Sequence, residues 1–185
     1  MINDILNEAD GKMDKSVEAT REEFAAIRAG RANPAMFSKI MVDYYGTPTP
    51  LQSLASFTAQ DARVILVSPY DMNALGNVER AIRDSDLGVN PANDGKLIRC
   101  VFPELTEERR KEYIKVARHK AEEGRVAIRN LRRHAKQHLE RMEKDGEVGQ
   151  DDVTGAEKRL DAATKKHTDA IDELLKHKEA ELLEV

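Results

Sequence analysis

The sequence predicts an α+β protein in which an antiparallel three-helix bundle carries a small inserted α/β domain, a β/α/β sandwich. Apolar residues recur every three or four positions over residues 2–28, 106–145 and 151–183, which is typical of long amphipathic helices. Between residues 31 and 105 the pattern changes to short alternating runs interrupted by Pro and Gly, as in strands and turns. Charged residues make up 35% of the 185 residues and aromatic residues only 4%, a composition that suits long helices.

The first predicted helix begins at residue 2 or 3 and ends at Arg28 or Ala29. Its apolar positions step by three or four residues from Ile2 to Ile27. Gly30 can follow the last helical turn, and Pro34 prevents the helix from continuing. We therefore expect the chain to leave the bundle at this point.

The inserted segment contains the signals of several strands and one short helix. Strands are predicted over residues 40–44, 54–58, 64–67 and 97–102, and a helix over 73–85. The two prolines between Gly46 and Pro50 predict a rigid turn. The run from Asn93 to Gly95 predicts a tight hairpin turn.

Two further long helices follow the insertion. Thr106 is the expected N-cap of the helix over residues 106–145, and Glu107 and Glu108 lie in its first turn. The last helix runs from Asp151 or Asp152 to about residue 183, and the short turn before it makes the two helices antiparallel neighbours. Because none of the three helices can bury its apolar stripe alone, they are expected to pack into one bundle.

The predicted domains are therefore residues 1–30 plus 106–185, the bundle, and residues 31–105, the insertion. The insertion is attached through two adjacent linkers, which we expect to act as a hinge that permits rotation. The hinge residues are Gly30, Arg31, Ala32 and Asn33 in the first linker, and Pro103, Glu104, Leu105 and Thr106 in the second.

Cations are concentrated in the second long helix, although the net charge of the whole chain is −4. Residues 109–136 hold eleven Lys and Arg and three Glu. At about 100° per residue, one flank of the apolar stripe carries a basic ribbon about 27 Å long. The basic ribbon consists of Arg118, Arg125, Arg129, Arg132 and Lys136. It matches the spacing of an RNA backbone, or alternatively its cations pair with acidic neighbours within the fold; the residues leave both open.

Other features argue against a membrane protein or a disulfide-bonded one. No run of eighteen apolar residues is present, and the N-terminus lacks the basic and apolar parts of a signal peptide. Cys100 is the single cysteine, so no internal disulfide can form. The sequence thus indicates a soluble cytoplasmic protein.

No catalytic pattern is evident, and we expect the chain not to be an enzyme. It has no phosphate-binding Gly-rich loop, so we expect no bound nucleotide or cofactor. His134 and His138 are four residues apart but lack the Glu of a zinc protease; we expect no metal site, while incidental binding by this pair stays open. His167 lies on an apolar stripe, and we expect a core histidine whose ring nitrogens have partners.

Five ordered motifs resemble the bacterial ribosome recycling factor family, and the resemblance covers essentially the whole chain. The motifs are Ile27 to Ala32, Tyr44 to Leu51, Ser85 to Pro91 with Asn93 to Gly95, Leu105 to Lys111, and Val126 to Arg133. The chain departs from the family at His134, where an acidic residue is usual, and residues 137–165 match mainly in pattern.

The resemblance implies a two-domain, L-shaped molecule with tRNA-like dimensions that acts after translation termination. It implies binding to rRNA of the large ribosomal subunit, and splitting of the ribosome together with elongation factor G and GTP, with release of mRNA and deacylated tRNA. We also expect the chain to be a monomer. Carried over by position, the rRNA contacts fall on Arg28, Arg31, Arg109, Arg110, Arg125, Arg129, Arg132 and Arg133. Arg118 joins them as a member of the basic ribbon.

A second class of function is a cytosolic helical scaffold or RNA chaperone without ribosome specificity. Cosedimentation with ribosomes over a salt series would separate this class from a ribosome-specific factor.

Overall fold

The computed structural model describes residues 1–184 and divides the chain into two compact units. Unit 1 comprises Met1–Phe24 and Ile114–Ala180, and unit 2 comprises Ala25–Tyr113 together with the segment that begins at Glu181. The predicted insertion, residues 31–105, and both predicted linkers lie inside unit 2. The predicted fold class, a long helical bundle with a small sheet domain, is confirmed.

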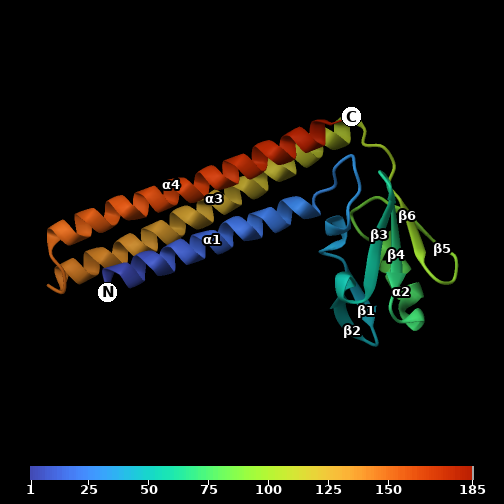
Figure 1. The fold of residues 1–185 in the computed structure, drawn as a ribbon, viewed down its shortest axis with the longest axis horizontal. Helices are drawn as coiled ribbons and strands as arrows, with labels where there is room; N and C mark the ends of the chain where they lie inside the picture. Colours follow the sequence, from blue (N-terminus) through green and yellow to red (C-terminus); the bar gives the residue numbers. More distant parts are fainter. Residues whose placement is uncertain (185) are drawn as a thin grey trace. The chain divides into compact units, whose positions relative to one another are not determined.

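Unit 1 is a bundle built from three helices. They are α1 (Ile2–Ala26), α3 (Glu107–Lys144) and α4 (Gln150–Leu183), and within unit 1 they run side by side, with α3 opposite in direction to the other two (Figure 1). All three predicted helices are present, and α1 ends two or three residues earlier than expected. The antiparallel arrangement of α3 and α4 follows from the short turn that joins them.

The predicted apolar stripes form the core of unit 1. Met13, Ile128, Leu139 and Ile171 are each 0% exposed. Gly124 lies where α3 approaches both neighbours, because a Cβ there would be 2.5 Å from Thr20 Oγ1 and 2.8 Å from Ile171 Cδ1. The missing side chain at this position lets the three helices approach more closely.

Helix α3 is capped at both ends, and the sequence predicted the cap at its start. The Arg109 amide donates a hydrogen bond to Thr106 Oγ1 at 3.1 Å, which confirms Thr106 as the N-cap. At the other end Gly146 has a positive φ of 74°, and the Glu147 amide donates to the Met142 carbonyl at 2.9 Å. This is the left-handed glycine cap that ends a helix and turns the chain.

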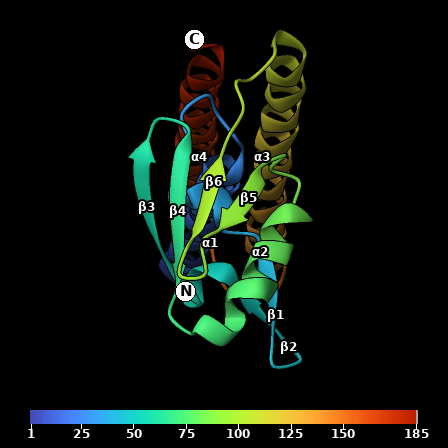
Figure 2. The same ribbon diagram turned by 90° about the vertical axis from the view of Figure 1, so that its right-hand side faces the viewer.

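Unit 2 contains a four-stranded antiparallel sheet with the strand order β3-β4-β6-β5 (Figure 2). The strands are β3 (Ala55–Asp61), β4 (Val64–Pro69), β5 (Asn90–Asn93) and β6 (Ile98–Val101). The sequence did not predict β5, because Asn-Pro-Ala-Asn has low strand propensity. As an edge strand, β5 tolerates Pro91 without the loss of an interior hydrogen bond.

A separate hairpin pairs β1 (Met41–Tyr44) with β2 (Thr47–Pro50). We predicted residues 46–50 as a rigid turn, but the turn is confined to Tyr45 and Gly46, whose φ angles are +49° and +81°. Positive φ at both central residues is typical of the type I′ turn that joins hairpin strands. The prolines lie in β2, which pairs with β1 alone, so their missing amides are tolerated.

Helix α2 (Leu75–Arg83) packs against β1 and β5, preceded by a 3₁₀ turn over Met72–Ala74. Two further 3₁₀ turns, Pro34–Phe37 and Leu51–Ser53, flank the hairpin. The Phe37 ring lies 5.2 Å from that of Phe57 and 5.9 Å from that of Phe102, centroid to centroid. These aromatic contacts hold the β3 strand and the end of β6 against the first 3₁₀ turn.

Among residues 1–184, none of the helices combines the length and the apolar character needed to cross a lipid bilayer.

Candidate nucleic-acid interface

The basic ribbon lies on one side of α3 within unit 1, as its spacing predicted. The apolar stripe of α3 beside the ribbon is buried at Ala121, Ile128 and Ala135. The side chains of the ribbon residues Arg118 and Arg129 are 63% and 55% exposed. The arginines thus flank the buried stripe and reach solvent, because residues on one side of a stripe repeat every three or four positions.

Three ribbon arginines pair with carboxylates of α4. Each bridge has a short contact, between Arg118 Nε and Glu179 Oε1 at 2.8 Å, Arg125 Nη2 and Asp172 Oδ1 at 2.7 Å, and Arg132 Nε and Asp161 Oδ1 at 2.6 Å. The sequence left open whether the ribbon cations have acidic neighbours, and in this structure these three arginines do. The acids at 161, 172 and 179 are 11 and 7 residues apart on one helix, so their shared face could have been read from the sequence.

A fourth carboxylate, Glu122 of α3 itself, is shared by two arginines. Its oxygens lie 3.0 Å from Arg129 Nη1 and 3.1 Å from Arg125 Nη1. The hydrogen bonds from Arg129 and then Arg125 lower the pKa of Glu122. Partial burial disfavours the charged form of Arg125, but the bonds to Asp172 and Glu122 outweigh it and raise its pKa. The hydrogen bond to Glu179 likewise raises the pKa of Arg118.

The pairs of Arg118, Arg129 and Arg132 reach solvent, whereas the side chain of Arg125 is only 20% exposed. Solvent-exposed pairs contribute only about 0.2–1 kcal/mol each to stability. An arginine can therefore exchange a carboxylate for a phosphate at small cost to the fold. A backbone phosphate carries the same single negative charge as a carboxylate and offers the same bidentate acceptor geometry. The α3–α4 pairs hold the guanidinium groups in a row while leaving them available to an anionic partner.

The remaining predicted contacts differ in how strongly they are held. Arg133 and Arg31 are exposed and have no ion-pair partner within residues 1–184. Arg109 lies 3.5 Å from Glu112, and Arg110 Nη1 donates to the Leu183 carbonyl at 3.4 Å. Of the predicted contacts, Arg118, Arg125, Arg129, Arg132 and Arg133 belong to unit 1, and Arg28, Arg31, Arg109 and Arg110 belong to unit 2.

Arg28 is unlike the other predicted contacts because it is buried, with 6% of its surface exposed. Its Nη2 donates a hydrogen bond to the Pro103 carbonyl, and its guanidinium lies 5.4 Å from the centre of the Phe102 ring. Its Nε has no partner within the described chain, and burial lowers the pKa of this guanidinium. In this structure Arg28 fastens the segment that enters the sheet domain to the segment that leaves it, and it does not face solvent.

The first predicted linker, and the residue directly before the second, are hydrogen-bonded to the turn between β3 and β4. The Ala32 amide donates to the Ala62 carbonyl at 2.8 Å, and the Phe102 amide donates to the Arg63 carbonyl at 2.7 Å. Ala32 is 5% exposed and Leu105 is 8% exposed. The two chain segments thus lie beside each other at one turn of the sheet, which is the arrangement that a two-stranded connection requires.

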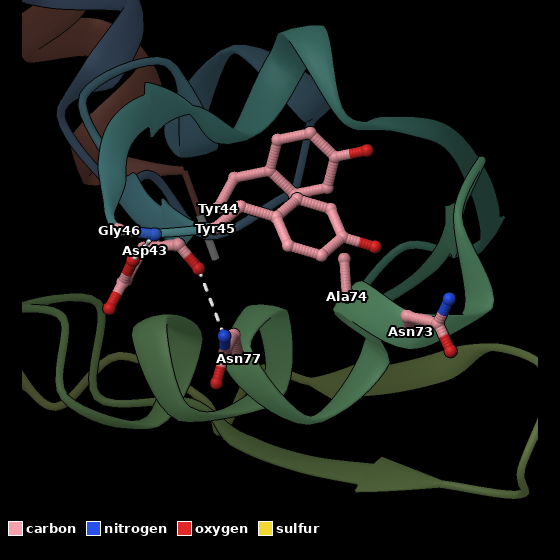
Figure 3. Close-up of a pocket in the computed structure, with 7 residues that line it drawn as sticks. All are labelled: Asp43, Tyr44, Tyr45, Gly46, Asn73, Ala74 and Asn77. Carbon is pink, nitrogen blue, oxygen red and sulfur yellow. Dashed lines mark hydrogen bonds between the residues drawn. The ribbon is translucent and has the colours of Figure 1, made fainter.

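A small cavity of about 150 Å³ lies beside the β1–β2 turn in unit 2 (Figure 3). It is lined by Asp43, Tyr44, Tyr45, Gly46, Asn73, Ala74 and Asn77. The hydroxyls of Tyr44 and Tyr45 both donate to Asp71 Oδ2, at 3.0 and 3.1 Å, and the Tyr45 side chain is largely exposed. The bond to Asp71 raises the pKa of Tyr44. Because both hydroxyls bond to the same carboxylate oxygen, the two rings are held in place and present an aromatic surface at the hairpin.

His134 and His138 line a cavity of about 130 Å³ in unit 1, together with residues of α1 that include Glu8 and Lys12. Glu8 is paired with Lys12 at 2.8 Å, and this contact, more than the distant charge of His138, lowers the pKa of Glu8. Glu8, a carboxylate that lines the cavity of the two histidines, is therefore already paired with a lysine.

Comparison with known proteins relates the chain to ribosome recycling factors. A sequence model described as "Ribosome recycling factor" matches residues 20–183. The chain is 84% identical over 185 residues to the ribosome-recycling factor of Nocardioides sp. and 66% identical to that of Acidothermus cellulolyticus, with 100% of both chains covered in each case.

Two solved structures resemble the chain over its full length. A solution structure of the ribosome recycling factor has a TM-score of 0.77 at 36% identity, and the match covers 100% of this chain and 98% of that one. The second, with a TM-score of 0.69 at 41% identity and 100% of both chains covered, belongs to models of the T. thermophilus ribosome recycling factor and the E. coli elongation factor G bound to the E. coli post-termination complex.

Proposed function

Because this chain belongs to the ribosome recycling factor family, a family of translation factors that are not enzymes, we propose that it binds the large subunit of the post-termination ribosome and takes part in splitting it. The observation that carries the proposal is the 84% identity to a ribosome-recycling factor over the whole length of both chains. The inference of function therefore rests on similarity over the complete chain and not on one motif.

The T. thermophilus relative, 41% identical, has been placed on the post-termination complex together with elongation factor G. By analogy, elongation factor G and GTP supply the energy for separating the subunits, and mRNA and deacylated tRNA leave afterwards. This chain acts as a monomer in the cytoplasm, where ribosomes translate. It needs no nucleotide or cofactor of its own for this role, because the GTPase is a separate protein.

The proposed contact with large-subunit rRNA is the basic ribbon together with Arg133 of α3. Arg118, Arg125, Arg129 and Arg132 exchange their carboxylate partners for phosphates when the chain binds. Such contacts fix position without reading base sequence. Arg31, Arg109 and Arg110 are the proposed contacts of unit 2, whereas Arg28, which is buried, acts on rRNA only through the segments it fastens.

The hinge at residues 30–33 and 103–106 remains part of the proposal. Rotation about it would let a force applied by elongation factor G to the sheet domain act on a bundle that is clamped to rRNA. The hydrogen bonds from the Ala32 and Phe102 amides to the β3–β4 turn support two adjacent linkers that bend together as one hinge.

The test is the double substitution Arg129→Glu/Arg132→Glu, assayed by cosedimentation with post-termination ribosomes over a salt series. Binding should fall at least tenfold, and the dependence on salt should become shallower, because fewer counterions are released. Circular dichroism and thermal melting should stay close to wild type, since the ion pairs lost are exposed.

The matched control is Arg21→Glu/Lys165→Glu, which makes the same charge change at two exposed, paired cations of unit 1 that are not in the ribbon. It should bind ribosomes nearly as well as wild type. Equal losses in both variants would show that net charge, and not the ribbon, governs binding. Equal affinity of the wild-type chain for ribosomes and for free RNA would favour the RNA chaperone instead.

A further inference from the structure

Two carboxylates of α1 and one imidazole of α4 converge on the surface of unit 1. Asp10 and Asp14 are one helical turn apart, and His167 of α4 faces them. His167 Nε2 lies 2.7 Å from Asp14 Oδ1 and 3.8 Å from Asp10 Oδ1. One ligand atom of each residue lies within 4.8 Å of the other two, the one such group of three among residues 1–184.

The imidazole is buried and its orientation is fixed. The side chain of His167 is 3% exposed, and Nδ1 lies 2.7 Å from the carbonyl oxygen of Ala163. A carbonyl oxygen can only accept a hydrogen bond, so Nδ1 carries a proton. This confirms the expectation that the ring nitrogens of His167 have partners, and it leaves Nε2 to face the carboxylates.

That arrangement requires a cation. A neutral imidazole with its proton on Nδ1 presents a lone pair at Nε2, and the carboxylate oxygens are acceptors too. Within the described chain, neither Asp10 nor Asp14 has a lysine or arginine within ion-pair distance. The contact is therefore stable only when a proton or a metal ion lies between Nε2 and the carboxylates.

The geometry suits a metal ion as well as a proton. Histidines that bind metals usually donate the other ring N–H to a backbone carbonyl or a carboxylate, as Nδ1 does here. With zinc bonds of about 2.0–2.2 Å, two ligands of a tetrahedral ion are about 3.4 Å apart. That separation falls between the two observed distances, 2.7 and 3.8 Å. Small rotations of Asp14 outward and Asp10 inward would complete it, and both side chains are partly exposed.

We propose that Asp10, Asp14 and His167 bind one divalent transition-metal ion of the zinc class, with water completing its coordination. The imidazole ligand selects Zn²⁺, Co²⁺, Ni²⁺ or Cu²⁺ over Mg²⁺ and Ca²⁺, which prefer oxygen ligands alone. The ion joins α1 to α4, helices from opposite ends of the chain, and stabilises the folded bundle. We did not expect this site from the sequence, because its ligands lie on helices far apart along the chain.

The site can be tested without ribosomes. The full chain is freed of metal with a chelator and titrated with Zn²⁺ by calorimetry, and with Co²⁺ by visible absorption, which reports the coordination geometry. One ion should bind per chain, and Zn²⁺ should raise the melting temperature of the wild-type chain. His167→Gln, Asp14→Asn and Asp10→Asn should each weaken Zn²⁺ binding at least tenfold and abolish the thermal shift.

Asp10→Asn is the decisive variant, because Asp10 lies beyond hydrogen-bond distance of Nε2 and a simple ion pair between His167 and Asp14 does not need it. It is partly exposed, so it keeps the test valid if His167→Gln, at a buried position, fails to fold. The matched control is His134→Ala/His138→Ala. It removes two histidines of unit 1 that lie outside the proposed site and should leave Zn²⁺ binding unchanged.

Three outcomes would overturn the proposal. They are an absence of Zn²⁺ binding by the wild-type chain, Zn²⁺ binding that Asp10→Asn leaves unchanged, and Zn²⁺ binding that disappears in the His134→Ala/His138→Ala variant. In the first case a proton between His167 and Asp14 suffices, in the second the ion is held without Asp10, and in the third it is held by the exposed histidine pair.

Discussion

Gly124 sets how closely the helices of unit 1 approach one another. Thr20 of α1 and Ile171 of α4 both reach the space that a Cβ at this position would occupy. Thr20 Oγ1 donates to the Ser16 carbonyl at 3.0 Å, and Ile171 is 0% exposed, so neither neighbour can move away freely. The cost of a larger residue here is therefore an overpacked core.

We predict that Gly124→Ala lowers the free energy of unfolding by about 1–3 kcal/mol, although alanine is the better helix former. Denaturant unfolding followed by circular dichroism would measure the change. The matched control is Gly155→Ala on α4, where a Cβ would meet nothing within 4 Å. Gly155→Ala should stabilise the chain by about 0.5–1 kcal/mol. A stabilised Gly124→Ala variant would contradict the close approach of the helices.

Cys100 gives a prediction that depends on pH. It is 0% exposed on β6, and burial raises the pKa of its thiol to about 12. The unfolded thiol ionises near its ordinary pKa of about 8.5. Its contribution to stability is therefore full below about pH 8.5 and is lost as the pH rises from there toward about 12, because only the unfolded chain releases the proton.

The free energy of unfolding of the wild-type chain, minus that of Cys100→Ala, should thus fall steadily between about pH 9 and pH 11. Urea denaturation of both proteins at each pH would measure this difference, and the other titrating groups cancel. In native protein at pH 8, thiol reagents should label Cys100 only as fast as the chain unfolds. Rapid labelling, or a difference that does not vary with pH, would show that the thiol is accessible.

At the scale of elements, α3 carries the arginines of the proposed rRNA contact, and α4 carries carboxylates that compete with phosphates for those arginines. The ribbon arginines are bonded to Asp161, Asp172 and Glu179 of the neighbouring helix. Each exposed pair adds little to stability. Their main effect is then on binding, because a phosphate must displace a carboxylate that is already in place.

We predict that Asp161→Asn/Asp172→Asn/Glu179→Gln binds post-termination ribosomes more tightly than wild type at low salt, by ~10-fold, since the ribbon gains net positive charge. The advantage should shrink as ionic strength rises. Cosedimentation at several salt concentrations would measure it. The control Asp151→Asn/Asp169→Asn/Glu173→Gln removes the same charge from exposed positions of the same helix outside the face of Asp161, Asp172 and Glu179, and it should have a smaller effect. Equal gains in both variants would argue for a general effect of net charge.

Periodicity predicted the long elements well, and local chemistry predicted the short ones less well. The three long helices repeat their apolar residues over many turns, so α3 and its cap at Thr106 were found. Strand β5 was missed because an edge strand of Asn, Pro and Ala is stabilised by its partner β6 and not by its own residues. The β1–β2 turn was misplaced because Tyr45 adopts a left-handed φ that its residue type disfavours.

The candidate site shows the same division between what one helix carries and what the fold adds. The ribbon was visible because its residues share one helix. The burial of Arg28 was not, because it depends on Phe102 and Pro103, which reach Arg28 only in the folded chain. The partners of His167 were hidden for the same reason, since its carboxylates lie on α1. The charge pattern of a single helix can be predicted from the sequence, whereas contacts between distant segments cannot.

At the scale of the whole molecule, binding by the bundle and splitting of the ribosome are separable steps. If the basic ribbon serves only to hold the chain on rRNA, weakening it should change how much factor is needed and not how fast bound factor acts. Uniform binding of this kind alters half-saturation alone, whereas an interaction formed only during splitting would also alter the maximal rate.

We therefore predict that Arg129→Glu/Arg132→Glu, assayed with elongation factor G and GTP, raises the concentration of factor needed for half-maximal splitting at least tenfold. The maximal rate should stay within about twofold of wild type. Light scattering of post-termination ribosomes over a range of factor concentrations would measure both quantities. A lower maximal rate at saturation, with half-saturation unchanged, would mean that these arginines act while the subunits separate, and that the clamp and the moving part of the mechanism are the same surface.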